Sequence, residues 1–266
     1  MTVGSDPTVK GGVVPKAYLI DMDGVLIKGR HAISGAADFL ARLQMAKAPF
    51  LLLTNNSLFT PRDHQARLWA MGLDIPSTSI FTSALATAHF LLQQRPTGSA
   101  YVVGEAGLTT ALHDIDYVLT EHAPEYVVLG ETLSLSFERL STALRLVASG
   151  SCFLATNPDV TGPSDQGAVL ACGAVAAMIT AATGIKAYFI GKPNPLMMRS
   201  ALRQLGVHSE DTVMIGDRMD TDIIAGIESG METILVLSGV TRREDVERFP
   251  YRPSRIADSV EDIEPF

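Results

Sequence analysis

The stretch of sequence that decides the fold is AYLIDMDGV, residues 17–25. The uninterrupted apolar run Ala17–Ile20 predicts a strand that is buried on both faces, as in a parallel sheet covered by helices. Asp21 and Asp23 follow this strand two positions apart, so both carboxylates can point the same way from its end. We therefore expect a parallel sheet with a strand that ends in acidic side chains.

Further apolar runs alternate along the chain with segments of helical periodicity. The predicted strands are Ala17–Ile20, Pro49–Leu53, Ala100–Val103, Tyr126–Leu129, Cys152–Ala155, Ala187–Ile190, Thr212–Ile215 and Thr233–Leu237. The predicted helices are Ala36–Ala46, Pro61–Met71, Ser83–Gln94, Ser136–Ala148, Gly167–Thr183, Pro195–Leu205, Thr221–Ser229 and Arg243–Arg248. Strands that alternate with helices in this way are typical of an α/β fold with parallel sheets.

Polar side chains follow four of the predicted strands at the point where each strand ends. The segments are Asp21-Met22-Asp23-Gly24, Thr54-Asn55-Asn56-Ser57, Gly191-Lys192-Pro193, and Gly216-Asp217 with Asp222 shortly after it. Parallel α/β sheets bind ligands outside the carboxyl ends of their strands, so these segments form the candidate site. A single Asp in such a place is typical of a turn or a helix cap, and only the combination indicates a functional site.

Four carboxylates are expected to converge in this site, those of Asp21, Asp23, Asp217 and Asp222. Burying such a cluster without compensating positive charge is costly. A hard divalent cation resolves the repulsion, and Mg²⁺ prefers oxygen ligands from one or two carboxylates together with phosphate oxygens. The sequence therefore predicts a Mg²⁺ site that handles a phosphorylated substrate.

The same segments carry the residue types that phosphoryl transfer needs. One Asp can act as a covalent nucleophile, and a second can protonate the leaving oxygen and then activate water. Lys192 is placed to neutralise developing charge, while the Thr54 hydroxyl and the amide or main-chain donors of Asn55 can hold phosphoryl oxygens. The candidate reaction is therefore the hydrolysis of a phosphate ester.

In this order, the four segments resemble the sequence motifs of the haloacid dehalogenase superfamily of phosphatases. The resemblance implies that Asp21 is the nucleophile and that Asp23 is the general acid and base. It also implies that Thr54 and Lys192 bind the phosphoryl group.

The resemblance further implies a metal site and a fold. Asp217 would ligate Mg²⁺ together with Asp21 and the main-chain carbonyl of Asp23, and Asp222 would support that site. The fold would be α/β, with a doubly wound parallel-sheet core into which an α/β cap domain is inserted.

A closer resemblance, to the NagD-like phosphatases, extends over nearly the whole chain from Tyr18 onward. It is carried by Thr54-Asn55-Asn56-Ser57, Tyr101-Val102-Val103-Gly104-Glu105, Val128-Leu129-Gly130-Glu131-Thr132, Ala155-Thr156-Asn157-Pro158-Asp159, Ala171-Cys172-Gly173-Ala174 and Gly191-Lys192-Pro193-Asn194-Pro195. This subfamily has a large α/β cap between its second and third motifs. We therefore expect a cap over 85–186 and a discontinuous core over 1–84 and 187–266, of which 1–15 is a loose leader.

Four residues are candidates for substrate binding in addition to the motif residues. Asn157 and Asp159 follow the predicted cap strand Cys152–Ala155 and are candidates for contact with the leaving group. An ordinary Asn-Pro-Asp turn is the alternative interpretation of these two residues. Asn55 and Asn56, in the second motif, are the other candidates.

The expected activity is Mg²⁺-dependent hydrolysis of small phosphomonoesters through a phosphorylated Asp21. The resemblance implies nucleoside monophosphates such as UMP and GMP as substrates. Sugar phosphates, glycerol phosphate or pyridoxal phosphate remain alternatives, because the cap loops decide the leaving group. A non-catalytic ligand-binding module is a further alternative, although such a protein would be expected to lack the nucleophile or a metal ligand.

Charge and composition restrict the partners. With 29 acidic and 21 basic residues the formal net charge is −8, which disfavours nucleic acid as a partner. The net charge does not exclude a small phosphorylated metabolite, because Mg²⁺ and Lys192 would set the local charge. A homodimer that forms through the cap is a further expectation.

Two cysteines among 266 residues cannot form a disulfide framework, and the N-terminal residues contain no apolar signal segment. No apolar run reaches the roughly 18 residues that a membrane helix needs. We therefore expect a cytoplasmic location and no membrane partner.

Overall fold

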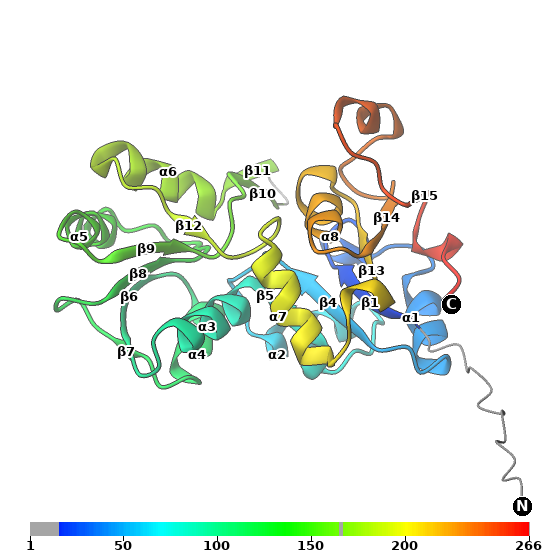
Figure 1. Cartoon of the computed structure of the whole chain (residues 1–266), viewed down its shortest axis with the longest axis horizontal. Helices are drawn as coiled ribbons and strands as arrows, with labels where there is room; N and C mark the ends of the chain where they lie inside the picture. Colours follow the sequence, from blue (N-terminus) through cyan, green and yellow to red (C-terminus); the bar gives the residue numbers. More distant parts are fainter. Residues whose placement is uncertain (1–15, 165–166, 266) are drawn as a thin grey trace, which may run out of the picture.

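The structure, a computed structural model, describes residues 16–164 and 167–265, and the predicted leader 1–15 lies outside this range. Two parallel sheets lie side by side along the longest axis of the molecule (Figure 1). The six-stranded sheet has the order β15-β14-β13-β1-β4-β5 and the five-stranded sheet the order β12-β9-β8-β6-β7. The predicted fold class, α/β with parallel sheets, is confirmed.

The strands of the six-stranded sheet are β1 (Ala17–Asp21), β4 (Phe50–Thr54), β5 (Ile80–Thr82), β13 (Thr212–Gly216), β14 (Glu232–Val236) and β15 (Arg255–Ala257). Those of the five-stranded sheet are β6 (Ser99–Val103), β7 (Val118–Leu119), β8 (Tyr126–Leu129), β9 (Cys152–Ala155) and β12 (Tyr188–Phe189). Two antiparallel hairpins pair β2 (Ile27–Lys28) with β3 (His31–Ala32) and β10 (Thr161–Ser164) with β11 (Gly167–Leu170).

The α-helices are α1 (Ala36–Met45), α2 (Pro61–Ala70), α3 (Ser83–Gln94), α4 (Ala106–His113), α5 (Phe137–Ala148), α6 (Cys172–Thr183), α7 (Pro195–Leu205) and α8 (Ile224–Glu228). Short 3₁₀ helices cover Ser77–Ser79, Ser209–Asp211, Arg243–Arg248 and Val260–Asp262, and a π-helical turn covers Met219–Ile223. No helix in the described part of the chain is long and apolar enough to cross a membrane.

The six-stranded sheet is covered by helices on both faces, because successive side chains of each strand point to opposite faces. Tyr18 and Ile20 of β1 pack in a cluster with apolar side chains of α1 and α2. Leu19, between them, packs with side chains of α7 and α8 instead. A strand buried on both faces reads as a continuous apolar run, which is the pattern that the sequence shows.

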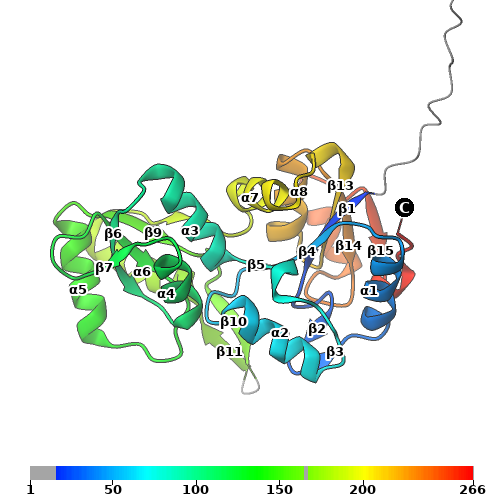
Figure 2. The same cartoon turned by 90° about the horizontal axis from the view of Figure 1, so that it is seen from below.

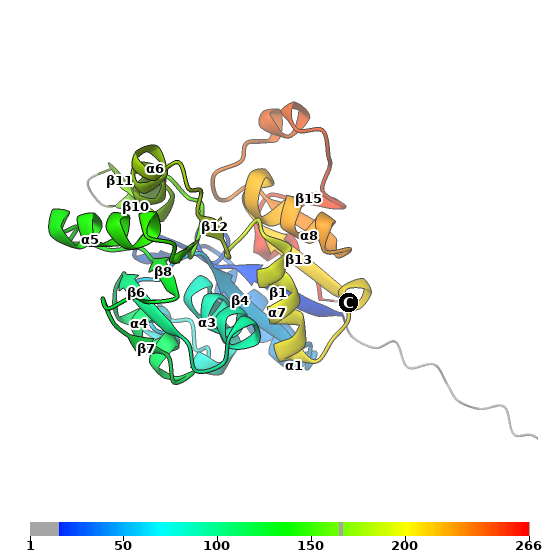
Figure 3. The same cartoon turned by 60° about the vertical axis from the view of Figure 1, so that its left-hand side comes forward.

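The five-stranded sheet has the same three-layer construction. Val127 and Leu129 of β8 pack against α5 and α6, whereas Val128 packs against α3 and α4. Figures 2 and 3 show these helices on opposite faces of the sheet. Helix α3 contributes Ala86 to the core of the six-stranded sheet and Ala88 to that of the five-stranded sheet, so it belongs to both cores.

The strand predicted at Ala187–Ile190 lies in an unexpected place. Tyr188 and Phe189 pair with β9 in the five-stranded sheet, although the predicted core began at residue 187. The chain enters the core of the six-stranded sheet only at Ile190. The division into a cap over 85–186 and a core over 1–84 and 187–266 stays a prediction. Its boundary leaves Tyr188 and Phe189 on the core side, although they pair with the five-stranded sheet.

Two predicted helices begin later than expected. The segment predicted as a helix from Gly167 begins as strand β11, in which Leu170 pairs with Thr161 before the helix begins at Cys172. The segment Gly167–Leu170 has only four residues, and an apolar run that short fits a strand as well as a helix. Periodicity alone could therefore not separate the strand from the helix that follows it. The helix predicted from Thr221 is preceded by the π-helical turn.

Candidate active site

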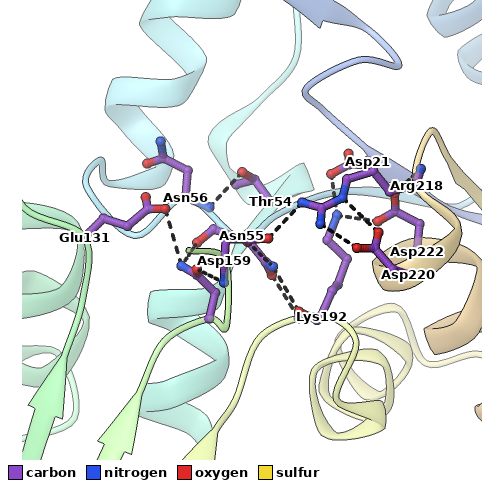
Figure 4. Close-up of polar contacts among 11 residues, drawn as sticks. Asp21, Thr54, Asn55, Asn56, Glu131, Asp159, Lys192, Arg218, Asp220 and Asp222 are labelled. Carbon is purple, nitrogen blue, oxygen red and sulfur yellow. Dashed lines mark hydrogen bonds and ion pairs between the residues drawn. The ribbon is translucent and has the colours of Figure 1, made fainter. Parts of the chain in front are cut away.

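The site forms where the carboxyl ends of β1, β4 and β13 lie side by side in the six-stranded sheet (Figure 4). Asp21 ends β1, Thr54 ends β4, and Asp217 follows β13. Lys192 arrives from the other sheet, three residues after β12. The structure therefore brings together residues from all four segments that the sequence singled out.

Lys192 is buried and lies between two carboxylates. Its Nζ donates to Oδ1 of Asp21 and lies 2.8 Å from Oδ1 of Asp222. Burial disfavours the charge of Lys192, but the attraction of Asp21 and Asp222 outweighs burial and raises its pKa. Burial also raises the pKa of Asp21 well above its usual range, and Lys192 opposes that shift only in part. The lysine is therefore a fixed positive charge at the carboxylate of Asp21.

Asp21, Asp217 and Asp222 form an acidic triad, with one carboxylate oxygen from each residue within 4.8 Å of the others. Burial, followed by repulsion from Asp222, raises the pKa of Asp217 to about 6. Among the described residues, Oδ1 of Asp217 is buried and has no hydrogen-bond partner, while its Oδ2 accepts from the main-chain N–H of Val240 at 2.7 Å. A buried acceptor without a donor is costly unless a ligand satisfies it.

The residues present fit a hard divalent cation. Lys192 pairs with Asp21 and Asp222, but its one positive charge does not balance three buried carboxylates, and oxygen ligands are what Mg²⁺ prefers. Two glycines leave the room that the carboxylate of Asp217 occupies. A Cβ on Gly24 would lie 2.3 Å from its Oδ2, and a Cβ on Gly239 would lie 1.9 Å from it. The triad can therefore bind a metal ion.

Asp222 is oriented by the π-helical turn after β13. The main-chain N–H groups of Asp222 and Ile223 both donate to the carbonyl oxygen of Arg218. In return, Oδ2 of Asp222 accepts from the N–H of Arg218 at 3.1 Å. A π-type turn inserted before a helix is a frequent feature of functional sites. Asp23, by contrast, is exposed and lies outside the acidic triad.

In the segment Thr54-Asn55-Asn56-Ser57, most side chains form hydrogen bonds with other groups of the protein. Thr54 is buried, and its hydroxyl accepts from the main-chain N–H of Asn56 at 3.0 Å. Oδ1 of Asn56 accepts from the N–H of Leu58, which closes an Asx turn. The side-chain amide of Asn55 donates to Asp159 and to the carbonyl of Lys192, and its Oδ1 accepts from the N–H of Lys192. The predicted role of the Asn55 amide in holding phosphoryl oxygens therefore has to compete with these three bonds.

The two residues predicted after β9 lie beside the same segment. Asn157 is buried, donates to the carbonyl of Asn55 at 2.8 Å, and accepts from the N–H of Asp159 at 3.1 Å. This last bond is the Asx turn that the sequence offered as the alternative for these residues. Asp159 accepts from Asn55 at 2.9 Å and forms an ion pair with Arg218 at 2.8 Å.

Sequence reasoning missed Glu131 and Arg218. Glu131 follows β8, and its Oε2 accepts from the N–H of Ser57 at 3.3 Å. Burial is the main cause that raises the pKa of Glu131 to about 7. Arg218 pairs with Asp159 and Asp220, and so links the loops after β9 and β13. The rule that ligands lie at strand ends finds Glu131 once it is applied to the predicted strand Tyr126–Leu129. Arg218 lies inside a segment that the rule did select, but its pairing with Asp159 depends on how the two sheets meet.

Comparison with known proteins agrees with the motifs. Residues 18–118 match the family described as haloacid dehalogenase-like hydrolase, and residues 189–263 match a related family of HAD-hydrolase-like proteins. The chain is 57% identical to a dihydroxyacetone phosphatase from Corynebacterium glutamicum over 93% of this chain and 90% of that protein. It is 42% identical to the ribonucleotide monophosphatase NagD from Escherichia coli over 94% of this chain and 98% of that protein.

Solved structures show the same relationship. The structure of NagD from E. coli aligns with a TM-score of 0.89 at 41% identity, covering 94% of this chain and 98% of that one. A 4-nitrophenylphosphatase from Thermotoga maritima aligns with a TM-score of 0.89 at 33% identity, covering 93% and 95%. The chain therefore belongs to the haloacid dehalogenase-like hydrolases and, among them, to the NagD-like phosphatases.

Proposed function

We propose that this protein is a Mg²⁺-dependent phosphatase that hydrolyses small phosphomonoesters through a phosphorylated Asp21. The observation that carries the proposal is the buried contact of Lys192 with Asp21 beside the acidic triad. Asp21, Asp217 and the main-chain carbonyl of Asp23 would hold the metal, with Asp222 in support. Bound Mg²⁺ would shield the negative charge that gathers between the substrate phosphate and the carboxylates.

In the first half-reaction, a carboxylate oxygen of Asp21 attacks phosphorus. The bond from Asp21 to phosphorus forms while the bond from phosphorus to the leaving oxygen breaks, and Asp23 protonates that oxygen. In the second, Asp23 takes a proton from water as the water attacks phosphorus, and the bond to Asp21 breaks to release phosphate. Lys192 stabilises negative charge on the phosphoryl oxygens throughout, and the hydroxyl of Thr54, at the end of the strand next to β1, is a further donor.

For the substrate, we infer a phosphate ester with a small, uncharged leaving group that carries hydroxyl or carbonyl groups, with dihydroxyacetone phosphate as the first candidate. The relative at 57% identity is named a dihydroxyacetone phosphatase, whereas the ribonucleotide monophosphatase is 42% identical. The sequence resemblance implies nucleoside monophosphates first, and dihydroxyacetone phosphate is not among its alternatives. Glu131 supports the present ranking, because a carboxylate at the junction of the two sheets is an acceptor for a substrate hydroxyl.

Nucleoside monophosphates are the second candidate, and a panel of phosphate esters separates the two. Phosphate release would be measured with Mg²⁺ for dihydroxyacetone phosphate, glycerol phosphate, sugar phosphates, pyridoxal phosphate, UMP and GMP. We expect the highest kcat/KM for a triose or sugar phosphate, and no release with EDTA. A higher kcat/KM for UMP or GMP would overturn the ranking, and no release from any ester would restore the non-catalytic interpretation.

The quaternary structure stays a prediction. A homodimer through the predicted cap, residues 85–186, is expected, and light scattering of the purified protein would decide between monomer and dimer. A monomer at working concentration would remove this expectation.

A further inference from the structure

Asn55 holds the main chain of Lys192 at two points. Its Nδ2 donates to the carbonyl oxygen of Lys192 at 3.0 Å, and its Oδ1 accepts from the N–H of the same residue at 2.8 Å. A side-chain amide that pairs with both main-chain groups of one residue fixes that residue's position and orientation. The position of the Lys192 main chain determines where its buried ammonium group meets Asp21.

The remaining donor of the same amide reaches the end of the five-stranded sheet. Nδ2 of Asn55 also donates to Oδ2 of Asp159 at 2.9 Å, and Oδ1 of Asp159 pairs with Arg218 at 2.8 Å. Asp159 follows β9, whereas Arg218 follows β13 of the six-stranded sheet. The carboxylate therefore bridges the two sheets at the amide that holds Lys192 (Figure 4).

The groups around Asn55 leave little room for its side chain to adopt another position. Its carbonyl oxygen accepts from Ser83 at 2.6 Å and from Asn157 at 2.8 Å. A Cβ on Gly191 would lie 2.6 Å from Oδ1 of Asn55 and 2.5 Å from the carbonyl oxygen of Thr156. Both sheets therefore contribute to one closely fitted polar junction around this asparagine.

We propose that Asn55 is a positioning residue, and that Asp159 acts through it to align Lys192 on Asp21 rather than by binding the leaving group. The inference rests on the proposed function, because it concerns the lysine of that reaction. As a consequence, the contact of Asp159, which follows a strand of the five-stranded sheet, with Asn55 fixes the position of the catalytic Lys192. Loss of Asp159 should then slow the chemical step for every substrate alike, because small misplacements of a catalytic group are costly in rate.

A double-mutant cycle tests this assignment with Asn55→Ala, Asp159→Ala and the double variant. The substrates would be dihydroxyacetone phosphate and 4-nitrophenyl phosphate, which share the phosphoryl group and differ in the leaving group. We expect each single variant to lower kcat about tenfold with little change in KM. The double variant should be no slower than Asn55→Ala alone, because Asp159 has lost the amide through which it acts.

Two outcomes would overturn the proposal. Losses that multiply in the double variant would mean that Asp159 acts independently of Asn55. A loss in Asp159→Ala that falls on KM, or on only one of the two substrates, would mean that Asp159 contacts the leaving group. This second comparison needs only Asp159→Ala, so it decides the question even if Asn55→Ala does not fold.

Asp220→Asn is the matched control, because Asp220, like Asp159, pairs with the guanidinium of Arg218 but, within the described part of the chain, makes no hydrogen bond or ion pair with Asn55. It should leave kcat unchanged for both substrates, and an equal loss there would place the effect on Arg218. Thermal unfolding of every variant reports on folding. Turnover by the wild-type protein separates failure of this inference from failure of the proposed function.

Discussion

Lys192 donates from its Nζ to Oδ1 of Asp21, a residue that lies 171 positions earlier in the chain. The two reach one another because β1 runs through the middle of one sheet, whereas Lys192 follows the edge strand of the other. The pair is buried, so neither charge is screened by bulk water. The site therefore forms only when the two sheets lie against one another, because each supplies one residue of this pair.

Metal binding should depend on the ionisation of Asp217. Its pKa is raised to about 6, first by burial and then by repulsion from Asp222, so protons compete with a cation below that pH. We expect the affinity for Mg²⁺ to fall by up to about tenfold per pH unit as the pH drops below 6. Calorimetric titration of the wild-type protein with MgCl₂ at several pH values would measure this.

Asp217→Asn provides the comparison for that titration. It keeps the side chain's shape but removes the charge that the proton would neutralise, so Mg²⁺ affinity should be low and less dependent on pH. The same affinity and the same pH dependence as the wild-type protein would show that Asp217 is not a ligand.

Metal binding should require a glycine at position 239, because any larger side chain would collide with the carboxylate of Asp217. A Cβ there would lie 1.9 Å from Oδ2 of Asp217, so Gly239→Ala must displace the carboxylate or the loop. We expect a marked loss of Mg²⁺ affinity, measured without substrate. Gly162→Ala is the control, because the nearest atom to its added Cβ would be 3.9 Å away. Equal affinities for the two variants would contradict the account.

The pH dependence of stability should contain a contribution from His64. Burial is the main cause that lowers its pKa from 6.5 to about 4, so the unfolded chain takes up a proton before the folded protein does. The wild-type protein should therefore lose up to about 3 kcal/mol from this group as the pH falls from 6.5 to 4. Relative to wild type, His64→Leu should gain stability over the same window, as measured by urea unfolding.

Glu131 should contribute with the opposite sign. Burial raises its pKa from 4.5 to about 7, so the folded protein takes up the proton first and gains stability as the pH falls from 7 to 4.5. Relative to wild type, Glu131→Gln should lose stability on acidification, which is the reverse of the His64 variant. If both variants follow the wild-type pH profile in parallel, neither group is shifted as described.

The sequence predicted the parallel sheets because strands buried on both faces leave an uninterrupted apolar run, as in Ala17–Ile20. It could not assign Tyr188–Phe189 to a sheet, because the run looks the same in either one and only the pairing with β9 decides. It also missed α4 and the edge strands β5, β7 and β15, which are short. Short edge elements depend on their neighbours rather than on their own pattern.

The site was predictable to the extent that it depends on strand ends. Asp21, Thr54 and Asp217 follow adjacent strands, so their convergence follows from the order of the sheet. The contacts of Asn55 with Asp159 and Lys192 join segments of two different sheets, and no local pattern encodes how those sheets meet.

The covalent intermediate is the central claim, and its direct detection is the most decisive measurement. Wild-type protein with Mg²⁺ would be mixed with dihydroxyacetone phosphate, quenched in acid within milliseconds, digested and examined by mass spectrometry. We predict a phosphoryl group on Asp21 that appears before free phosphate and is absent from Asp21→Asn, which should stay folded and inactive. Phosphate release without a phosphorylated Asp21, or full turnover by Asp21→Asn, would contradict the account.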